Sequence, residues 1–260
     1  MINRLPFAKK SLGQHWLTDI ASLEAICDAA EVSPDDVVLE VGPGFGTLTE
    51  LLVLRAQRVV AVEFDEKLAA ELAPRVQAQN LQVVHQDILH FDLTTLPPGY
   101  KVVANIPYYL TSNLLRVLSE SASPAARVVV LVQKEVAERV VAEPGEMSLL
   151  SVSVQFYWQA NLGRLVPAEL FTPPPKVDSQ ILILQRRSVP LFPDVDTKQF
   201  FRIVKAGFSS KRKTLLNSLS AGLALSKADT VELLTRANIN PTLRAQNLSL
   251  ENWHHLYQVA

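Results

Sequence analysis

Val37-Val-Leu-Glu-Val-Gly-Pro-Gly-Phe-Gly46 is the stretch of this 260-residue sequence that decides the fold. Its first half is apolar and rich in valine, which is typical of a parallel strand covered on both faces. Gly42, Gly44 and Gly46 then remove side chains from a turn, so the backbone can bend sharply and approach a ligand. Helix-compatible residues follow from Thr47 to Leu54. The stretch therefore predicts a strand, a glycine turn and a helix that form a nucleotide-type binding corner.

The next apolar run, Arg58-Val-Val-Ala-Val-Glu63, predicts a neighbouring strand that ends in a carboxylate. Glu63 stands where it can accept hydrogen bonds from both ribose hydroxyls of a bound nucleoside. An exposed strand-end charge and glycines that only form a turn are the alternative interpretation, because glycine patterns alone are weak evidence.

A third apolar run, Val102-Val-Ala-Asn-Ile-Pro-Tyr-Tyr109, predicts a buried strand that ends in a chemically specific sequence. The exocyclic amine of adenine is a poor nucleophile, because its lone pair is delocalised into the ring. Asn105 Oδ1 and the carbonyl of Ile106 can accept hydrogen bonds from that amine, and Pro107 fixes the backbone. Tyr108 would stack on the extruded base, an interaction worth roughly 1–3 kcal/mol. A strand-ending turn with Tyr108 in the core is the alternative.

Six motifs spread over nearly the whole chain resemble the small-subunit (16S) ribosomal RNA adenine dimethyltransferases. They are Lys10-Ser-Leu-Gly-Gln-His-Trp-Leu17, Glu40-Val-Gly-Pro-Gly-Phe-Gly-Thr-Leu-Thr49, Asn105-Ile-Pro-Tyr108, Gln133-Lys-Glu-Val-Ala-Glu-Arg139, Phe171-Thr-Pro-Pro-Pro-Lys-Val-Asp-Ser179 and Lys211-Arg-Lys-Thr-Leu-Leu-Asn-Ser-Leu219. The resemblance implies a transferase that uses S-adenosyl-L-methionine. It would dimethylate two adjacent adenosines at N6, in the hairpin loop near the 3′ end of that RNA, during ribosome biogenesis.

The resemblance also assigns roles to individual residues. The residues it implies for cofactor binding are His15, Leu17, Gly42, Gly44, Glu63, Asp87, Ile88 and Asn105. Asp87 would accept a hydrogen bond from the amino group of the cofactor's adenine, and Ile88 would line the ring. Asn105, Tyr108 and Phe171 would form the catalytic site, with Phe171 packed on the target base opposite Tyr108. A core phenylalanine beside a proline-stiffened loop is the alternative for Phe171.

The sequence departs from the family pattern at three places. The usual Asn is His15 and the usual Phe is Trp16, in a segment that folds over the cofactor in the family. Trp16 keeps an aromatic surface, whereas His15 has a different shape and hydrogen-bonding capacity. Met147-Ser-Leu149 stands where many relatives carry Tyr-Gly-Arg. The loss of that arginine predicts an altered grip on the RNA.

We expect an α/β fold, a Rossmann-like methyltransferase sheet with a small C-terminal helical domain. The sheet would be mostly parallel with one antiparallel strand, and a hairpin of Ser151–Tyr157 and Gln180–Leu184 would complete it. Pro190 and Pro193 break the periodicity, so residues 1–187 would form the N-terminal arm and methyltransferase domain. Residues 188–260 would form the helical, RNA-contacting domain.

The composition is that of a globular protein, with 48% hydrophobic residues and a formal net charge of −1. The segment from Arg186 to Arg212 is nonetheless locally basic, as expected of a phosphate-binding surface. Cys27 is the only cysteine, which excludes an internal disulfide and a cysteine-rich zinc site. No apolar run is long enough for a membrane span and no signal-type segment is present, so we expect a cytoplasmic protein. A monomer is the simplest expectation. We expect no metal, because no second cluster of ligands appears at regular spacing and the implied reaction needs none.

Three alternatives remain from the sequence. A large-subunit (23S) rRNA adenine N6-methyltransferase of the antibiotic-resistance type would share the catalytic core. The segments beginning at Phe171 and Lys211 nonetheless favour the small-subunit enzyme. Its substrate would be the rRNA in a pre-ribosomal particle. A noncatalytic RNA-binding assembly factor would keep the fold but would not need an intact Asn105-Ile-Pro-Tyr108. A nicotinamide dehydrogenase would share the glycine turn and the ribose-binding acid.

Overall fold

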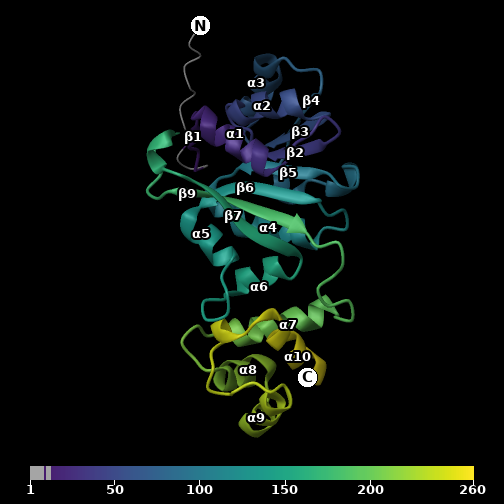
Figure 1. Ribbon diagram of the computed structural model, residues 1–260, viewed down its shortest axis with the longest axis vertical. Helices are drawn as coiled ribbons and strands as arrows, with labels where there is room; N and C mark the ends of the chain where they lie inside the picture. Colours follow the sequence, from purple (N-terminus) through teal and green to yellow (C-terminus); the bar gives the residue numbers. More distant parts are fainter. Residues whose placement is uncertain (1–8, 10–12) are drawn as a thin grey trace. The chain divides into compact units, whose positions relative to one another are not determined.

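The computed structural model describes Lys9 and residues 13–260, and the chain forms two compact units (Figure 1). The first unit contains the chain up to Glu138 together with Trp158–Arg186. The second contains Arg139–Tyr157 and Arg187–Ala260. Residues 139–157, which the predicted division assigned to the first domain, thus pack in the second unit. Residues 10–12 of the predicted N-terminal arm lie outside the described part of the chain.

A seven-stranded sheet in the order β4-β3-β2-β5-β6-β9-β7 forms the centre of the first unit. Its strands are β2 (Val37–Val41), β3 (Arg58–Glu63), β4 (Leu81–His85), β5 (Lys101–Asn105), β6 (Arg127–Gln133), β7 (Trp158–Val166) and β9 (Ser179–Arg186). The ladders from β4 through β6 are parallel. Only β9 runs against the others, because it is antiparallel to both β6 and β7. This confirms the predicted sheet.

The register of the parallel strands brings three chain segments to one edge of the sheet. Val41 pairs with Val62, and the glycine turn and Glu63 follow directly. Asn105, the last residue of β5, pairs with Leu131 of β6. The carboxyl ends of β2, β3 and β5 therefore meet at the edge where open α/β sheets bind their ligands.

Among the described residues, five α-helices belong wholly or partly to the first unit. They are α1 (Ile20–Ala29), α2 (Thr47–Arg55), α3 (Glu66–Val76), α4 (Thr111–Glu120) and α5 (Lys134–Val140). Side chains of α1 and α2, such as Ile26 and Leu52, pack in one core cluster with Val38 and Val103 of the sheet. Aspartates cap two helices: Asp19 accepts the backbone N–H of Ser22, and the Asp65 carboxylate accepts two N–H groups of α3.

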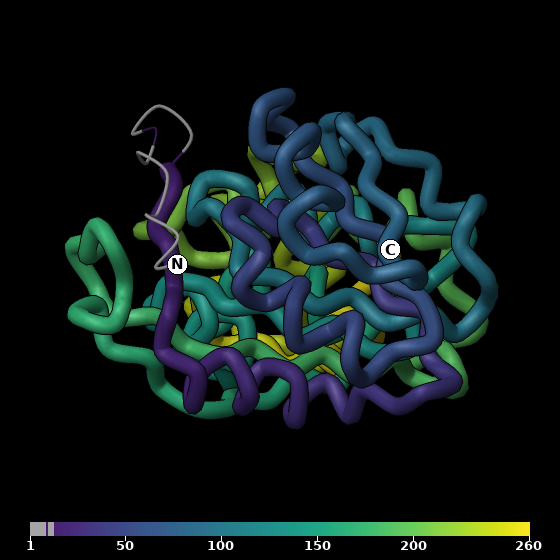
Figure 2. Tube along the Cα trace, turned by 90° about the horizontal axis from the view of Figure 1, so that it is seen from above, coloured from purple at the N-terminus to yellow at the C-terminus, as the bar shows by residue number. Residues whose placement is uncertain are grey.

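A small second sheet fixes the segment that precedes α1. It consists of β1 (Trp16–Leu17) and β8 (Phe171–Thr172), which pair in antiparallel fashion with Leu17 opposite Phe171. Figure 2 traces the purple segment from β1 into α1. This pairing joins residues more than 150 positions apart in sequence and holds both at the ligand-binding edge.

The prediction of a strand at Ser151–Tyr157 was wrong. Residues Leu149–Gln155 form helix α6, and the strand of the sheet begins only at Trp158. The Ser148 hydroxyl accepts the N–H of Ser151, and the Ser151 hydroxyl accepts the N–H of Ser148. This capping box starts a helix that buries Val152 and Phe156, one turn apart, in the core of the second unit.

The second unit is helical, as predicted for the C-terminal part of the chain. Besides α6 it contains α7 (Thr197–Phe208), α8 (Leu215–Leu223), α9 (Lys227–Arg236) and α10 (Leu250–Val259). Its core is built around the fully buried Phe200, Leu219 and Trp253. In the described residues, no helix has the length and apolar character that crossing a membrane requires.

Candidate functional site

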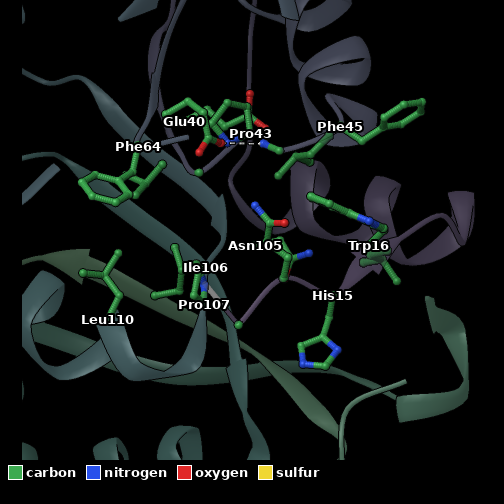
Figure 3. A pocket seen from close by; sticks show the side chains of 18 of the residues that line it. His15, Trp16, Glu40, Pro43, Phe45, Phe64, Asn105, Ile106, Pro107 and Leu110 are labelled. Atoms are coloured by element: carbon green, nitrogen blue, oxygen red, sulfur yellow. Dashed lines mark hydrogen bonds between the residues drawn. The ribbon is translucent and has the colours of Figure 1, made fainter. Parts of the chain in front are cut away.

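A cavity opens at the carboxyl ends of β2, β3 and β5 (Figure 3). Its wall is contributed by several stretches that are far apart in sequence. They are residues 13–17 and Leu23, the glycine turn with its flanks (40–45, 47 and 48), the strand ends at Glu63, Phe64, Gln86 and Ile88, residues 105–110, and Phe171. All of these belong to the first unit. The cavity therefore joins the glycine turn to the Asn105-to-Tyr108 segment.

The glycine turn adopts a backbone that favours glycine. Gly42, Gly44 and Gly46 all have positive φ, at 65°, 56° and 86°. At Gly44 a Cβ atom would lie 2.5 Å from Cζ3 of Trp16, so the indole packs directly on the turn. Trp16 can pack on the turn because Gly44 has no side chain. The sequence analysis did not predict this contact between Trp16 and Gly44.

Glu63 clamps this turn to the end of β3. Its Oε2 accepts the N–H of Gly44 at 3.0 Å, and its Oε1 accepts the N–H of Asp65 at 2.8 Å. The residue is only 6% exposed, and burial raises the pKa of its carboxyl, although both hydrogen bonds act in the opposite direction. The carboxylate lines the cavity, where its remaining lone pairs can accept ligand hydroxyls.

A second carboxyl group, Glu40, was not assigned a role from the sequence. It lies on β2, is 1% exposed and lines the same cavity. Its Oε2 has no hydrogen-bond partner among the described residues. Burial is the main reason why the pKa of Glu40 is raised to about 8, and the charge of the neighbouring Glu63 contributes to the same shift. An acidic residue within an otherwise apolar strand is the signal that could have identified it.

The predicted catalytic residues Asn105 and Tyr108 both line the cavity. In Figure 3 the Asn105 side chain lies between the glycine turn and His15. Tyr108 begins a short 3₁₀ helix, and its hydroxyl lies 2.8 Å from the hydroxyl of the fully buried Ser179. Burial raises the pKa of Tyr108, so the phenol stays neutral near pH 7.

The segment that leads into α1 contributes five consecutive residues, 13–17, to the wall. Leu17 is 1% exposed and pairs with Phe171, which is 2% exposed. Both lie in the same hydrophobic cluster as Val38 and also border the cavity. His15 lies beyond them, partly exposed, with Nδ1 2.7 Å from the carbonyl oxygen of Pro173.

Asp87 differs from the other predicted cofactor residues. Gln86 and Ile88 on either side of it line the cavity, but Asp87 is not among the lining residues. Its carboxylate accepts the N–H of Leu89 at 2.9 Å and pairs with His90 at 3.4 Å. The side chain therefore caps a 3₁₀ turn at the rim of the cavity, and its contact with adenine stays a prediction.

Titratable groups in this cavity do not form a metal site. Nowhere in Lys9 or residues 13–260 do three or more histidine, cysteine, aspartate or glutamate side chains gather in a way that could hold a metal ion. What the cavity offers instead is a pair of buried acids, a neutral amide acceptor and several aromatic rings. Such a wall suits a cationic nucleoside next to a flat base.

Comparison with known proteins identifies the family to which the chain is similar. The family model described as "Ribosomal RNA adenine dimethylase" matches residues 7–260. The chain is 44% identical to "Ribosomal RNA small subunit methyltransferase A" of Dehalococcoides mccartyi (strain ATCC BAA-2266 / KCTC 15142 / 195), over 96% of this chain and 87% of the relative. The protein of the same name from Streptococcus equi subsp. zooepidemicus (strain MGCS10565) is 42% identical, over 95% and 90%.

Solved structures that resemble almost the whole chain include two from rRNA-modifying or adenosine-methylating enzymes. A dimethyladenosine transferase from Plasmodium falciparum superposes with a TM-score of 0.78 at 27% identity, covering 93% of this chain and 96% of that one. The 23S rRNA methyltransferase ErmE gives a TM-score of 0.76 at 28% identity, with coverages of 94% and 98%. With a family match over almost its full length, the chain belongs to the ribosomal RNA adenine dimethylases.

Proposed function

We propose that the protein is an S-adenosyl-L-methionine-dependent enzyme that converts two adjacent adenosines of small-subunit rRNA to N6,N6-dimethyladenosine. The two adenosines would be those in the hairpin loop near the 3′ end of that RNA. One observation carries the proposal: Asn105 and Tyr108 line the same cavity as the glycine turn and Glu63. A methyl donor at one end of this cavity and a base at the other would face each other.

The residues present fit the cofactor. S-adenosylmethionine carries an ammonium and a sulfonium, and the cavity holds the buried carboxyl of Glu40 with one oxygen that lacks a partner. A cation bound there would favour the charged form of this carboxyl. Glu63 would hold the ribose, with Leu17, Gly42, Gly44, Ile88 and Asn105 around the remainder and Asp87 at the adenine. When bound, the cofactor supplies an electrophilic methyl group.

The protein's own contribution to the reaction is mainly one of positioning. Asn105 Oδ1 and the carbonyl of Ile106 would accept the two N–H groups of the target amine and orient its lone pair. Pro107 has φ of −56°, within the narrow range that its ring allows, so this geometry is fixed before the substrate binds. A neutral amine needs no general base before attack, and the proton can leave to water afterwards.

The choice of substrate rests on sequence relatives rather than on the fold. The two similar solved structures, one a dimethyladenosine transferase and one acting on 23S rRNA, differ by only 0.02 in TM-score. The relatives at 42–44% identity are all named as small-subunit methyltransferases. We therefore favour a substrate in the small ribosomal subunit over the antibiotic-resistance type.

We also propose that the helical part of the chain, residues 188–260, contacts RNA. Lys211, Arg212 and Lys213 are consecutive and exposed between α7 and α8. Such clustered cations bind phosphate groups with release of counterions. The protein would act as a monomer in the cytoplasm on a pre-ribosomal particle.

Methyl transfer to isolated particles tests this proposal. The purified chain is incubated with immature small or large subunits and labelled S-adenosylmethionine, and the modified nucleotides are located by mass spectrometry. We expect two dimethyladenosines in the small-subunit hairpin, and a loss of about 100-fold or more in rate for Asn105→Ala. Labelling of large subunits would favour the antibiotic-resistance type. Binding without transfer, with Asn105→Ala retaining its cellular role, would favour a noncatalytic assembly factor.

A further inference from the structure

We infer that Arg75, on helix α3 outside the cavity, is a positioning residue that fixes the glycine turn in the shape that binds the cofactor. Its side chain acts through Phe45, the residue that separates Gly44 from Gly46. Arg75 itself is not among the described residues that line the cavity. The inference rests on the proposed function, because it concerns how the proposed cofactor site keeps its shape.

The glycine turn has little in its own sequence that fixes its conformation. Three of the five residues from Gly42 to Gly46 are glycines with positive φ. Glycine adopts both signs of φ about equally readily, so such a turn has many backbone states. Helix α2 begins directly after Gly46, which has no side chain to cap it. Contacts from other elements therefore have to select one conformation of the turn.

Helix α3 supplies such contacts at its C-terminal end. A Cβ atom at Gly46 would lie 2.7 Å from Cδ1 of Leu72 and 3.5 Å from Cγ2 of Val76, so α3 packs directly on the turn. In Figure 3 the Phe45 ring points away from Asn105. The ring is therefore available to a side chain from outside the cavity.

Arg75 makes two contacts with Phe45, and both depend on its guanidinium group. Nη1 donates a hydrogen bond to the backbone carbonyl oxygen of Phe45 at 2.8 Å, and Cζ lies 4.1 Å from the centre of the Phe45 ring. Nη2 donates to Oε2 of Glu71 at 3.2 Å, and the Arg75 side chain is only 13% exposed. A planar guanidinium can combine hydrogen bonds with an aromatic contact in this way, whereas a lysine ammonium cannot.

The backbone of the turn is thus held at two consecutive residues. Glu63 accepts the N–H of Gly44, and Arg75 donates to the carbonyl of Phe45. The turn and the Glu63 carboxylate can therefore keep their relative positions before a nucleoside binds. A site that is ordered in advance loses less conformational freedom on binding, which raises its affinity. Asn105 lies on another strand, so the transfer step should not depend on Arg75.

Arg75→Met tests the inference, with Lys67→Met as the matched control. Lys67 also lies on α3 and also pairs with Glu71, at 3.8 Å, but its side chain is 75% exposed. Calorimetry measures the Kd of S-adenosylhomocysteine. Methyl transfer to immature small subunits gives KM for S-adenosylmethionine and kcat.

For Arg75→Met we expect Kd and KM to rise roughly 10-fold, because a charged hydrogen bond and a cation–π contact no longer order the turn. The value of kcat should stay within about 2-fold of wild type, as expected when only cofactor binding is weakened. Lys67→Met should change Kd by less than about 2-fold, since exposed ion pairs contribute little.

Phe45→Leu separates the two contacts, because it removes the ring and keeps the carbonyl. We expect Kd to rise by roughly 3-fold in this variant. The double variant Phe45→Leu/Arg75→Met should bind no more weakly than Arg75→Met alone, because both substitutions break the same contact. Effects that multiply in the double variant would show that Arg75 does not act through Phe45 and would overturn the inference.

A Kd for Arg75→Met close to that of wild type would also overturn the inference, even if the variant unfolds more easily. The same holds if Lys67→Met weakens binding as much as Arg75→Met. If Arg75→Met does not fold, Arg75→Lys decides: weaker cofactor binding at unchanged kcat supports the inference, and wild-type binding overturns it. A wild type that binds no S-adenosylhomocysteine overturns the proposed function, and the inference with it.

Discussion

Glu40 makes the stability of the protein depend on pH in a direction opposite to that of most carboxylates. The pKa of this buried group is raised from 4.5 to about 8. Between these values the folded protein keeps a proton that the unfolded chain has lost. The contribution of Glu40 to stability is therefore fully present below pH 4.5 and is lost as the pH rises through 8.

Glu40→Gln should remove this dependence. We expect the free energy of unfolding of the variant, relative to wild type, to increase between pH 5 and pH 9 by about 4 kcal/mol, at about 1.4 kcal/mol per pKa unit. Urea unfolding at several pH values measures the difference. Glu50→Gln, an exposed position on α2, is the control and should show no such trend. A pH-independent difference for Glu40→Gln would contradict the assignment.

Gly44 permits a separate prediction, because a matched glycine exists. Gly44 and Gly99 both have positive φ, but a Cβ at Gly99 has nothing within 4 Å, whereas one at Gly44 meets Trp16. Both alanine variants should lose roughly 1–2 kcal/mol through backbone strain. Gly44→Ala should in addition displace Trp16, which shifts the tryptophan emission and weakens binding of S-adenosylhomocysteine. Equal effects of both variants on emission and binding would show that the Trp16 contact is unimportant.

The positions of site residues were predictable where the sequence places a residue at a strand end. Glu63 and Asn105 follow apolar strands, so their arrival at one edge follows from the parallel sheet. Glu40 and the contact of Trp16 with Gly44 were not predictable in this way. Their roles depend on burial and on a pairing between β1 and β8 that no local pattern encodes.

At the scale of elements, the apolar strands were correctly predicted and the last hairpin was not. Leu150-Ser-Val-Ser-Val154 alternates with the period of a strand, yet it lies in helix α6. The true edge strand β7 is mostly polar or partly exposed, so its sequence carries little strand signal. Strand β7 is fixed by its hydrogen bonds to β9, which the sequence of β7 alone does not indicate.

The capping box of α6 yields a test at this scale. Ser148→Ala removes the acceptor for the N–H of Ser151, and the free energy of unfolding should fall by about 1 kcal/mol. Chemical denaturation followed by circular dichroism measures this loss. Ser210→Ala, at an exposed loop position, should change stability by less than about 0.5 kcal/mol. A loss no greater than that of the control would mean that tertiary packing alone fixes α6.

At the scale of the whole molecule, two cores are assembled from interleaved stretches of chain. Residues 139–157 bring Met147 and Phe156 into the core of the second unit, before the chain returns to the sheet. Met147 is 4% exposed, so the residue that replaces the family's tyrosine at this place serves packing. The prediction of altered RNA binding therefore depends on the missing arginine alone.

Separate cores predict that heat unfolds the chain in two transitions. The cofactor cavity lies in the first unit, so S-adenosylhomocysteine at 100 times its Kd should stabilise that transition by about 2.7 kcal/mol. Ser148→Ala should lower only the other transition, since α6 belongs to the second unit. Scanning calorimetry measures both effects. A single transition that moves as a whole would show that the units unfold together.

The position of β9 between β6 and β7 has a consequence for biosynthesis. As the chain leaves the ribosome, β6 is complete long before its neighbour β9, because Ser179–Arg186 is synthesised some fifty residues later. Strand β9 must then insert between β6 and β7, which has already emerged. Until then β6 presents an unpaired edge, which in a nascent polypeptide invites association with other chains. The protein thus reaches its native sheet only late in translation.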